Sequence, residues 1–310
     1  MANLPLAVTS SALRPPRGLA ARLDVPRRVT LIAAGLVVLL VGLLLAFIGW
    51  NGIQIFTATG ASLTDVFAPI WSPSSTPARF GILPFVFGTL GVMVVAALIA
   101  APLSIGLAIF MAEVAPPWAR SITRPAMEVF VGIPSVVYGF LGLTILVPFL
   151  RDNFRGIGFT LGFSWFAGSL VLALMILPTI ASIAYDTLIT IPADLRSGSL
   201  ALGTTRWQTI RHILLPAAKT GLLTAVILGM MRAAGEALAV QMVIGNRPTI
   251  PTSLTAPMTT LTSQITLDMG NTVSGEPWNQ VLWTMGLVLL LMSFTFVVIV
   301  RALGRRASQP

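Results

Sequence analysis

The sequence is 310 residues long, and 55% of the residues are hydrophobic whereas only 9% are charged. Its mean hydropathy is +0.90. Soluble domains carry roughly one quarter charged residues, so the composition excludes a soluble enzyme, a nucleic-acid-binding domain and a disordered chain. It favours an all-α polytopic membrane protein. There is no Cys and a single His, His212, and we therefore expect no disulfide, no metal site, no cofactor and no catalytic residue.

Six segments are apolar over the roughly 20 residues that a membrane-spanning helix needs. They are residues 29–50, 82–112, 125–149, 162–188, 217–245 and 281–303. The first segment follows Arg27 and Arg28, as a signal peptide would, but it is longer than the ~7–15 apolar residues of a signal sequence. We therefore expect six transmembrane helices, the first of them a retained anchor.

The basic residues predict the orientation of these helices. With the N-terminus in the cytoplasm, the inner regions collect fourteen: Arg14, Arg17, Arg22, Arg27, Arg28, Arg120, Arg124, Arg196, Arg206, Arg211, Lys219, Arg301, Arg305 and Arg306. The outer loops hold four: Arg79, Arg151, Arg155 and Arg247. This positive-inside bias places both termini in the cytoplasm. The net charge of +9 is then a sign of topology rather than of nucleic-acid binding.

The predicted spans divide the chain into regions of different character. We expect a flexible basic cytoplasmic tail near lipid headgroups at 1–28, a first transmembrane helix at 29–50 and an external loop at 51–81. A core domain of five transmembrane helices follows at 82–303, and a short cytoplasmic tail at 304–310. The Thr-rich external loop 246–280 has two interpretations, a solvated connection or a docking surface for an external partner.

The largest inner loop, residues 189–216, contains a glycine and a Leu-Pro pair at a defined spacing. Gly203 can adopt positive φ and end a short helix, and Pro216 suits the first turn of the next helix. This predicts a helix, a turn and a second helix, with apolar side chains free for a partner's groove. The residues concerned are Ser197, Gly198, Ser199, Leu200, Ala201, Leu202, Gly203, Thr204, Thr205, Arg206, Trp207 and Pro216.

Two opposite charges lie within the fifth predicted span. Arg232 and Glu236 are four residues apart, so on a continuous helix their side chains share one face. A charge at the bilayer centre costs at least ~2.5–3.5 kcal/mol, so such a pair predicts a function. One alternative is a neutralising salt bridge that only stabilises the bundle. The other is a transport path in which the guanidinium contacts an oxyanion in bidentate fashion.

The motifs together resemble a known family. The spacing from Gly203 through Ile213 to Leu215-Pro216 is similar to the cytoplasmic loop of permeases of binding-protein-dependent ABC importers, with Ser197-Gly198-Ser199 in place of Glu-Ala-Ala. Arg-Ala-Ala-Gly-Glu at 232–236 and Val-Ile-Gly-Asn at 243–246 resemble phosphate-importer permeases. Phe-Gly-Ile-Leu-Pro at 80–84 resembles the PstC type in particular, and Ile-Pro-Ser-Val-Val-Tyr-Gly at 133–139 agrees.

This resemblance implies a type I ABC importer permease in a bacterial plasma membrane. Its partners would be a PstA-like permease, an ATPase dimer that binds the ATP, an external phosphate-binding protein and inorganic phosphate. The resemblance also implies that Arg232 and Glu236 are critical for transport and that the loop around Gly203 contacts the ATPase. Ser135 and Tyr138 are further candidates for the pathway, although hydroxyls near a proline can simply satisfy freed carbonyls.

Other functions conflict with parts of the sequence. A self-powered pump needs a phosphate-binding Gly-x-x-x-x-Gly-Lys-[Ser/Thr] loop, but the only lysine, Lys219, follows Pro-Ala-Ala. A secondary transporter predicts internal repeats, and none is evident. A permease for another oxyanion, such as sulfate or molybdate, stays open as an alternative, whereas a structural scaffold would not need Arg232.

Overall fold

The computed structural model describes the backbone of residues 17–307 and the side chains of residues 27–302. The predicted flexible tail lies partly outside this range, as do residues 308–310. From Arg17 onward, however, the expected tail is helical, because Ala, Leu and Arg there favour a helix. The helix at the other end continues to Ala307, into the expected C-terminal tail. The chain divides into two compact units, with the boundary between Trp50 and Asn51.

In the part that the structure describes, the first unit consists of the portion of α1 (Arg17–Ala58) that precedes Asn51. Apolar side chains between Val29 and Phe47 are exposed all round this helix. A helix that is apolar on every side suits a lipid environment rather than water.

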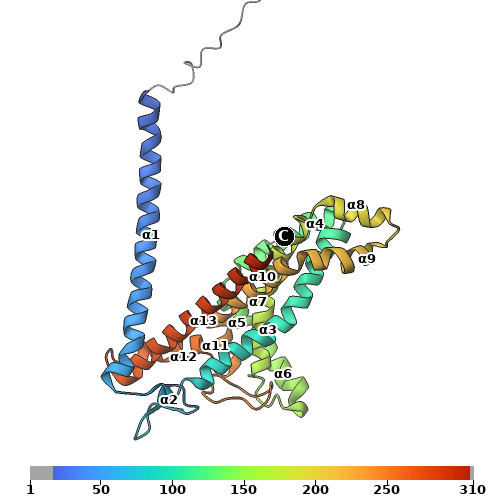
Figure 1. The fold of residues 1–310 in the computed structure, drawn as a ribbon. Helices are drawn as coiled ribbons and strands as arrows, with labels where there is room; N and C mark the ends of the chain where they lie inside the picture. Colours follow the sequence, from blue (N-terminus) through green and yellow to red (C-terminus); the bar gives the residue numbers. More distant parts are fainter. Residues whose placement is uncertain (1–16, 308–310) are drawn as a thin grey trace, which may run out of the picture. The chain divides into compact units, whose positions relative to one another are not determined.

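The second unit, from Asn51 onward, is almost entirely helical (Figure 1). Its longer helices are α3 (Leu83–Ile109), α4 (Pro117–Gly132), α7 (Trp165–Ile189), α10 (Leu215–Ala234) and α13 (Pro277–Ala307). Shorter helices are α2 (Leu63–Val66), α5 (Ser135–Leu141), α6 (Val147–Phe154), α8 (Ala193–Ala201), α9 (Arg206–Thr209), α11 (Leu238–Ile244) and α12 (Leu261–Asp268). Two-residue strands, β1 (Trp71–Ser72) and β2 (Arg79–Phe80), form an antiparallel pair. Three π-helical turns, η2 (Phe110–Val114), η3 (Gly142–Leu146) and η5 (Ile210–Leu214), and two 3₁₀ turns, η4 (Arg155–Ile157) and η6 (Met269–Asn271), complete it.

Six helices of the described chain are long and apolar enough to cross a membrane, which confirms the predicted number. They cover Arg27–Ala58, Leu83–Val114, Ser135–Ile157, Trp165–Ile189, Arg206–Ala234 and Pro277–Ala302. The second, fourth and sixth lie within a few residues of their predicted positions. The first extends beyond residues 29–50 at both ends, and the third and fifth differ more.

The third span was predicted at 125–149, and this is wrong at its start. Residues 117–132 form the separate helix α4, and α5 begins only at Ser135. The break falls at Ile133, whose φ of −65° and ψ of 128° are extended. Pro134 explains it, because a proline disfavours helical geometry in the preceding residue.

The fifth span was predicted at 217–245, and both ends are wrong. The helix starts at Arg206 and passes through η5 into α10, which ends at Ala234. A second short helix, α11, then starts at Leu238. Gly235, a weak helix former, lies at the break, so the long apolar run is two helices rather than one.

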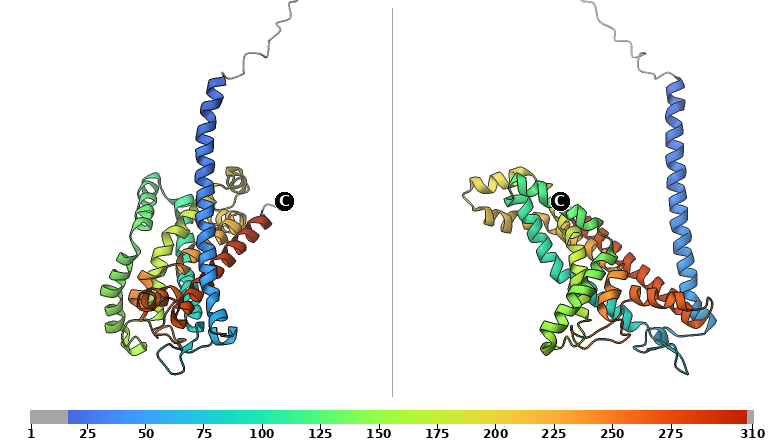
Figure 2. Two further views of the ribbon diagram at one scale, coloured as in Figure 1. Left: turned by 90° about the vertical axis from the view of Figure 1, so that its left-hand side faces the viewer. Right: turned by 180° about the vertical axis from the view of Figure 1, so that it is seen from behind.

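Small residues hold the centre of the second unit together. Ala96 and Ala100 of α3, Ala184 of α7, and Ala225 of α10 are buried in one apolar cluster with Ile180. Small side chains let helix backbones approach closely, which is how membrane helices associate. Within this unit, α8 and α9 lie at one end of the bundle, and α2 with the strand pair lies at the other (Figures 1 and 2).

The Thr-rich loop 246–280 folds back into the protein, which neither interpretation of it anticipated. Its part from 258 to 264 is buried, with Met258 and Ser263 at 0% exposure. The Leu261 N–H donates to Thr89 Oγ1 of α3 at 2.9 Å, and the Met258 N–H donates to the Ile244 carbonyl at 3.2 Å. Two hydroxyls of this segment also bond to backbone groups: Thr262 Oγ1 donates to the Glu236 carbonyl at 2.8 Å, and Thr260 Oγ1 accepts from the Ser263 N–H at 3.2 Å.

Gly88 allows this return, because a Cβ there would overlap the backbone oxygen of Thr259. Replacing Gly88 by Ala should therefore destabilise the protein by about 1–3 kcal/mol, as overpacking does. Gly106 lies in the same helix with no atom within 4 Å of an added Cβ. Gly106→Ala should raise stability by up to about 1 kcal/mol. Thermal unfolding of the purified protein in detergent measures both, and equal melting temperatures would contradict the packing role of Gly88.

Candidate translocation site and coupling loop

Arg232 lies in the last turn of α10 and joins it to two other helices. Its Nη1 donates to Thr179 Oγ1 of α7 at 3.0 Å, and its Nη2 donates to the Val131 carbonyl of α4 at 3.5 Å. The residue is nevertheless exposed. A fixed but accessible guanidinium can bind an anion without first giving up its orientation.

The expected pairing of Arg232 with Glu236 is wrong. The helix ends between them, and the described residues contain no ion pair joining them. Glu236 Oε1 instead accepts from the Ala239 N–H at 3.3 Å, in the first turn of α11. Its carbonyl accepts from Thr262 Oγ1 at 2.8 Å. The carboxylate thus stabilises the start of α11, where orphan N–H groups and the helix dipole favour negative charge.

Tyr138 lies close to the Arg232 contacts. Its hydroxyl donates to the Phe130 carbonyl at 2.9 Å, beside the Val131 carbonyl that Arg232 contacts. Tyr138 and Arg232 therefore bind consecutive carbonyls at the end of α4. Ser135 starts the same helix, α5, as Tyr138 and is half-buried.

Close packing fixes α5 against α11. A Cβ at Gly139 would lie 2.8 Å from Cα of Ala239 and 2.8 Å from Sδ of Met242. The glycine of the Ile-Pro-Ser-Val-Val-Tyr-Gly string is thus needed for helix contact. Through this contact, the helix that Glu236 caps is held beside the helix that carries Tyr138.

Two features of this site were not predicted. Thr179, the partner of Arg232, follows Pro178 inside α7, and a hydroxyl next to a proline in an apolar span was the available signal. A pocket of about 260 Å³ lies between α4 and α7 and includes Val131 in its lining. Its other lining residues are Arg124, Met127, Glu128, Pro178 and Ser182.

The loop 189–216, called the coupling loop below, has the predicted helix–turn–helix form. Helix α8 ends at Ala201, and Gly203 follows with φ of +81°, which confirms the predicted glycine turn. Thr205 then starts α9 with a capping box, in which Thr205 and Gln208 bond each other's backbone N–H groups at 2.8 and 3.3 Å. Pro216 lies inside the continuous helix that starts at Arg206, directly after the π turn η5, so the prediction that it lies in the first turn of a new helix is wrong.

Hydroxyl groups close the turn of this loop from inside. The hydroxyl oxygen of Ser199 lies 2.7 Å from that of Thr204 and 3.0 Å from that of Thr209, and the two threonine oxygens are 3.1 Å apart. Ser199 and Thr209 are buried. The Ser-Gly-Ser string at 197–199 therefore contributes a hydroxyl to the interior of the turn.

The outer surface of the turn is apolar. Leu200 is 47% exposed, Leu202 86% and Trp207 61%. Large apolar side chains gathered on one exposed turn indicate an interaction surface.

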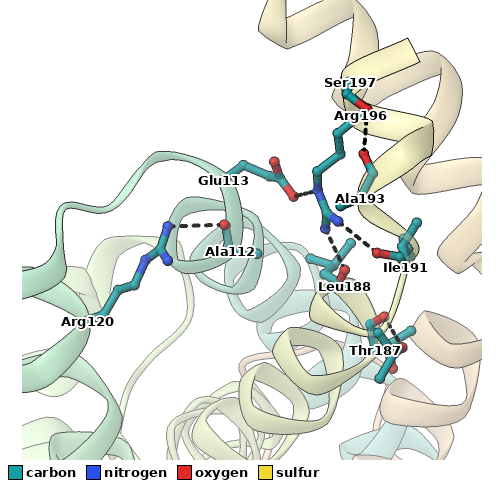
Figure 3. A network of polar contacts seen from close by, with 10 residues as sticks. Ala112, Glu113, Arg120, Thr187, Leu188, Ile191, Ala193, Arg196 and Ser197 are labelled. Atoms are coloured by element: carbon teal, nitrogen blue, oxygen red, sulfur yellow. Dashed lines mark hydrogen bonds and ion pairs between the residues drawn. The ribbon is translucent and has the colours of Figure 1, made fainter. Parts of the chain in front are cut away.

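Arg196 ties the coupling loop to the rest of the unit (Figure 3). Its Nε donates to Glu113 Oε1 at 2.9 Å, and its two terminal nitrogens donate to the carbonyls of Ile191 and Leu188 at 2.8 Å each. Arg120 of α4 donates to the carbonyl of Ala112, the residue before Glu113, at 3.2 Å. These contacts collect α8, α7, α4 and the end of α3 in one polar network.

The Gly203 turn can be tested by substitution. Gly203→Val should cost about 1–2 kcal/mol locally, because a β-branched residue is strained at positive φ. Gly203→Asn should cost less, because asparagine tolerates this region. Hydrogen exchange of residues 199–209 in the purified protein should show faster opening for the valine variant only. Equal exchange in both variants would show that the turn does not depend on the glycine.

At the opposite end of the unit, a capping box holds the short helix α2. Asp65 Oδ2 accepts from the Ser62 hydroxyl at 2.6 Å and from the Ser62 N–H at 3.0 Å. These bonds favour the charged carboxylate and lower the pKa of Asp65. The stabilisation is therefore present above the unfolded pKa of about 3.9 and is lost as the pH falls through the lower folded value.

Protection of the amides at 62–67 should thus stay constant from pH 7 to about 4.5 and fall at more acidic pH. The measurement is hydrogen exchange corrected for the intrinsic effect of pH. Asp65→Asn is the control and should remove this pH dependence. A loss of protection at the same pH in both proteins would contradict the role of the carboxylate.

The described chain combines six helices long enough to span a membrane with an accessible arginine beside a helix break and an exposed apolar helix–turn–helix. These features are those of a multi-pass transport subunit that works with a partner. Residues 104–309 match the family described as binding-protein-dependent transport system inner membrane component. The chain belongs to this family of ABC importer permeases, whose members are transport subunits rather than catalytic ones.

Individual relatives agree with the family. The chain is 52% identical over 84% of its length to a probable ABC transporter permease protein, YqgH, of Bacillus subtilis, and covers 84% of that protein. It is 34% identical to the phosphate transport system permease protein PstC of Xylella fastidiosa, over 90% of each chain. It is also 30% identical to a probable phosphate permease PstC of Methanocaldococcus jannaschii, over 90% of this chain and 92% of that one.

Solved structures support the fold. A bacterial ABC transporter that imports alginate matches with a TM-score of 0.62 at 16% identity, over 94% of this chain and 100% of that one. The MetNI methionine transporter matches with a TM-score of 0.53 at 22% identity, over 72% of this chain and 95% of that one. The predicted type I ABC importer permease fold is therefore correct.

Proposed function

We propose that this chain is the PstC-type permease subunit of an ATP-driven importer of inorganic phosphate. The observation that carries the proposal is the Arg232 guanidinium, which is oriented by Thr179 and Val131 and yet exposed. Guanidinium has five N–H donors, and the two described bonds leave donors for an oxyanion. The PstC relatives, which are named as phosphate permeases, support phosphate as that oxyanion.

The translocation path would run between this chain and a PstA-like permease, with Arg232 as a transient ligand. Glu236 would act through the backbone, by keeping the helix break in place, rather than by holding the arginine. Tyr138 would fix the end of α4, and Ser135 would lie at the start of the neighbouring helix. This division of roles follows from their hydrogen bonds and helix positions.

Energy would come from a partner ATPase dimer, because this sequence has no phosphate-binding loop for ATP. The exposed Leu200, Leu202 and Trp207 would insert into that partner. The positive-inside bias supports a bacterial plasma-membrane location with the coupling loop and both termini in the cytoplasm. An external phosphate-binding protein would dock at the opposite end, where α2 and the strand pair lie.

The substrate can be tested on the purified complex with its ATPase. Hydrolysis of ATP should be stimulated by phosphate with its binding protein, and not by sulfate or molybdate with theirs. Stimulation by another oxyanion would replace phosphate as the substrate and keep the architecture. A chain that transports without any ATPase would be a secondary carrier, and the proposal would be wrong.

Arg232→Lys keeps the positive charge but loses the planar fork. We expect at least a tenfold lower phosphate uptake, roughly the contribution of one charge-assisted hydrogen bond. Uptake of radioactive phosphate into proteoliposomes measures it. Arg301→Lys, at the exposed end of α13, is the matched control and should transport normally. Normal uptake by Arg232→Lys would argue against bidentate binding.

A further inference from the structure

One half-buried side chain, Arg196, bonds the coupling loop to residues from two other parts of the unit. Arg196 is 24% exposed and its partner Glu113 is 17% exposed. One guanidinium makes three hydrogen bonds of 2.8–2.9 Å to two different elements outside its own helix. Figure 3 shows it reaching from α8 toward Glu113 of η2 on one side and toward Leu188 and Ile191 on the other.

The strength of these contacts separates them from the other described ion pairs. Arg124 and Glu128 are 3.9 Å apart and 61% and 74% exposed, and Arg151 and Asp152 are 50% and 61% exposed. Exposed pairs contribute little because water screens them. Charge-assisted bonds in a sheltered site are stronger. Among the described ion pairs, the one at Arg196 is therefore best able to hold while the loop moves.

The same network leads to both partners of Arg232. Arg196 holds the Leu188 carbonyl of α7, and Thr179 lies nine residues earlier on that helix, about 13.5 Å along its axis. Arg120 attaches α4 beside Glu113, and Val131 lies further along α4. Helix α7 is thus bonded directly to Arg196, and α4 is bonded through Arg120 to the residue before Glu113.

We propose that Arg196 is a positioning residue that makes α8 move as one body with α7 and α4. When the ATPase displaces the coupling loop, Thr179 and Val131 then move with it, and the orientation of the Arg232 guanidinium changes. Glu113 fixes the direction of the Arg196 guanidinium, so that its terminal nitrogens meet the Leu188 carbonyl of α7 and the Ile191 carbonyl just after that helix. This inference rests on the proposed function, because it assigns Arg196 to transmission within that transport cycle.

The test uses the complex of this chain with its partner permease and ATPase in proteoliposomes, with phosphate and its binding protein. Arg196→Gln should lower the phosphate taken up per ATP hydrolysed by about tenfold, a typical magnitude for coupling between sites, while basal hydrolysis continues. Arg196→Lys keeps the charge but has fewer donors in a fixed geometry, and should fall between Arg196→Gln and wild type. Glu113→Gln should lower the ratio less. Arg301→Gln is the matched control with an unchanged ratio.

A second readout does not depend on the substrate. The chain has no Cys, so spin labels can be placed uniquely at Asp194→Cys on α8 and Ser121→Cys on α4, both of which are exposed. The wild-type background should give one narrow distance distribution, and Arg196→Gln should broaden it. A complex that fails to transport phosphate would overturn the proposed function, whereas the label distances would still test the attachment.

Two results would overturn the inference. One is an uptake-to-hydrolysis ratio for Arg196→Gln equal to that of Arg301→Gln. The other is an unchanged label distribution together with uptake and hydrolysis that fall in parallel with the amount of assembled complex. The second result would show that Arg196 supports folding and assembly without transmitting motion.

Discussion

The unpaired carbonyl groups at the ends of helices are the constraint on which this structure depends. The last carbonyls of a helix have no partner within it, and an apolar surrounding makes an unpaired carbonyl costly. At the end of α4, Tyr138 and Arg232 supply the missing donors. At the end of α7, Arg196 supplies them. Arginine suits this task because it brings several donors and complements the negative end of the helix dipole.

The proposed transport site and the coupling loop are therefore built on the same chemistry. Each places an arginine across a helix end and gives it a second partner, Thr179 in one case and Glu113 in the other. The difference lies in exposure. Arg232 is exposed, while Arg196 is largely sheltered. The first arrangement leaves donors for a ligand, and the second uses them for attachment.

Composition and local motifs predicted much of this architecture. The number of spans and the turn at Gly203 follow from hydrophobic length and from glycine's freedom at positive φ, both of which are local properties. The break after Ala234 was missed because hydropathy does not distinguish one long apolar helix from two short ones. Gly235 marks the break, and the new start of the helix is stabilised by the Glu236 carboxylate, which accepts from the Ala239 N–H; hydropathy reports neither.

Contacts between distant segments could not be predicted in the same way. Burial of residues 258–264 depends on Thr89, about 170 residues earlier in the chain, and on the lack of a side chain at Gly88, where the Thr259 backbone packs. Polar composition suggested solvent for this segment because hydroxyls are common at surfaces. In the folded protein, the hydroxyls of Thr260 and Thr262 bond to backbone groups instead. The Arg196–Glu113 pair is likewise separated by 83 residues, and no short motif contains both.

The π turn at Ile210–Leu214 also affects how the neighbouring sequence is oriented. Each residue of an α-helix rotates the chain by about 100°, and a π turn holds roughly one residue more per turn than an α turn. The helix that starts at Arg206 and the helix that ends at Ala234 are therefore out of phase, although they are continuous. Before and within the π turn, Trp207 is exposed and Ile210 is buried, and after it Ala225 is buried. The π turn thus changes which way the following residues face without interrupting the helix.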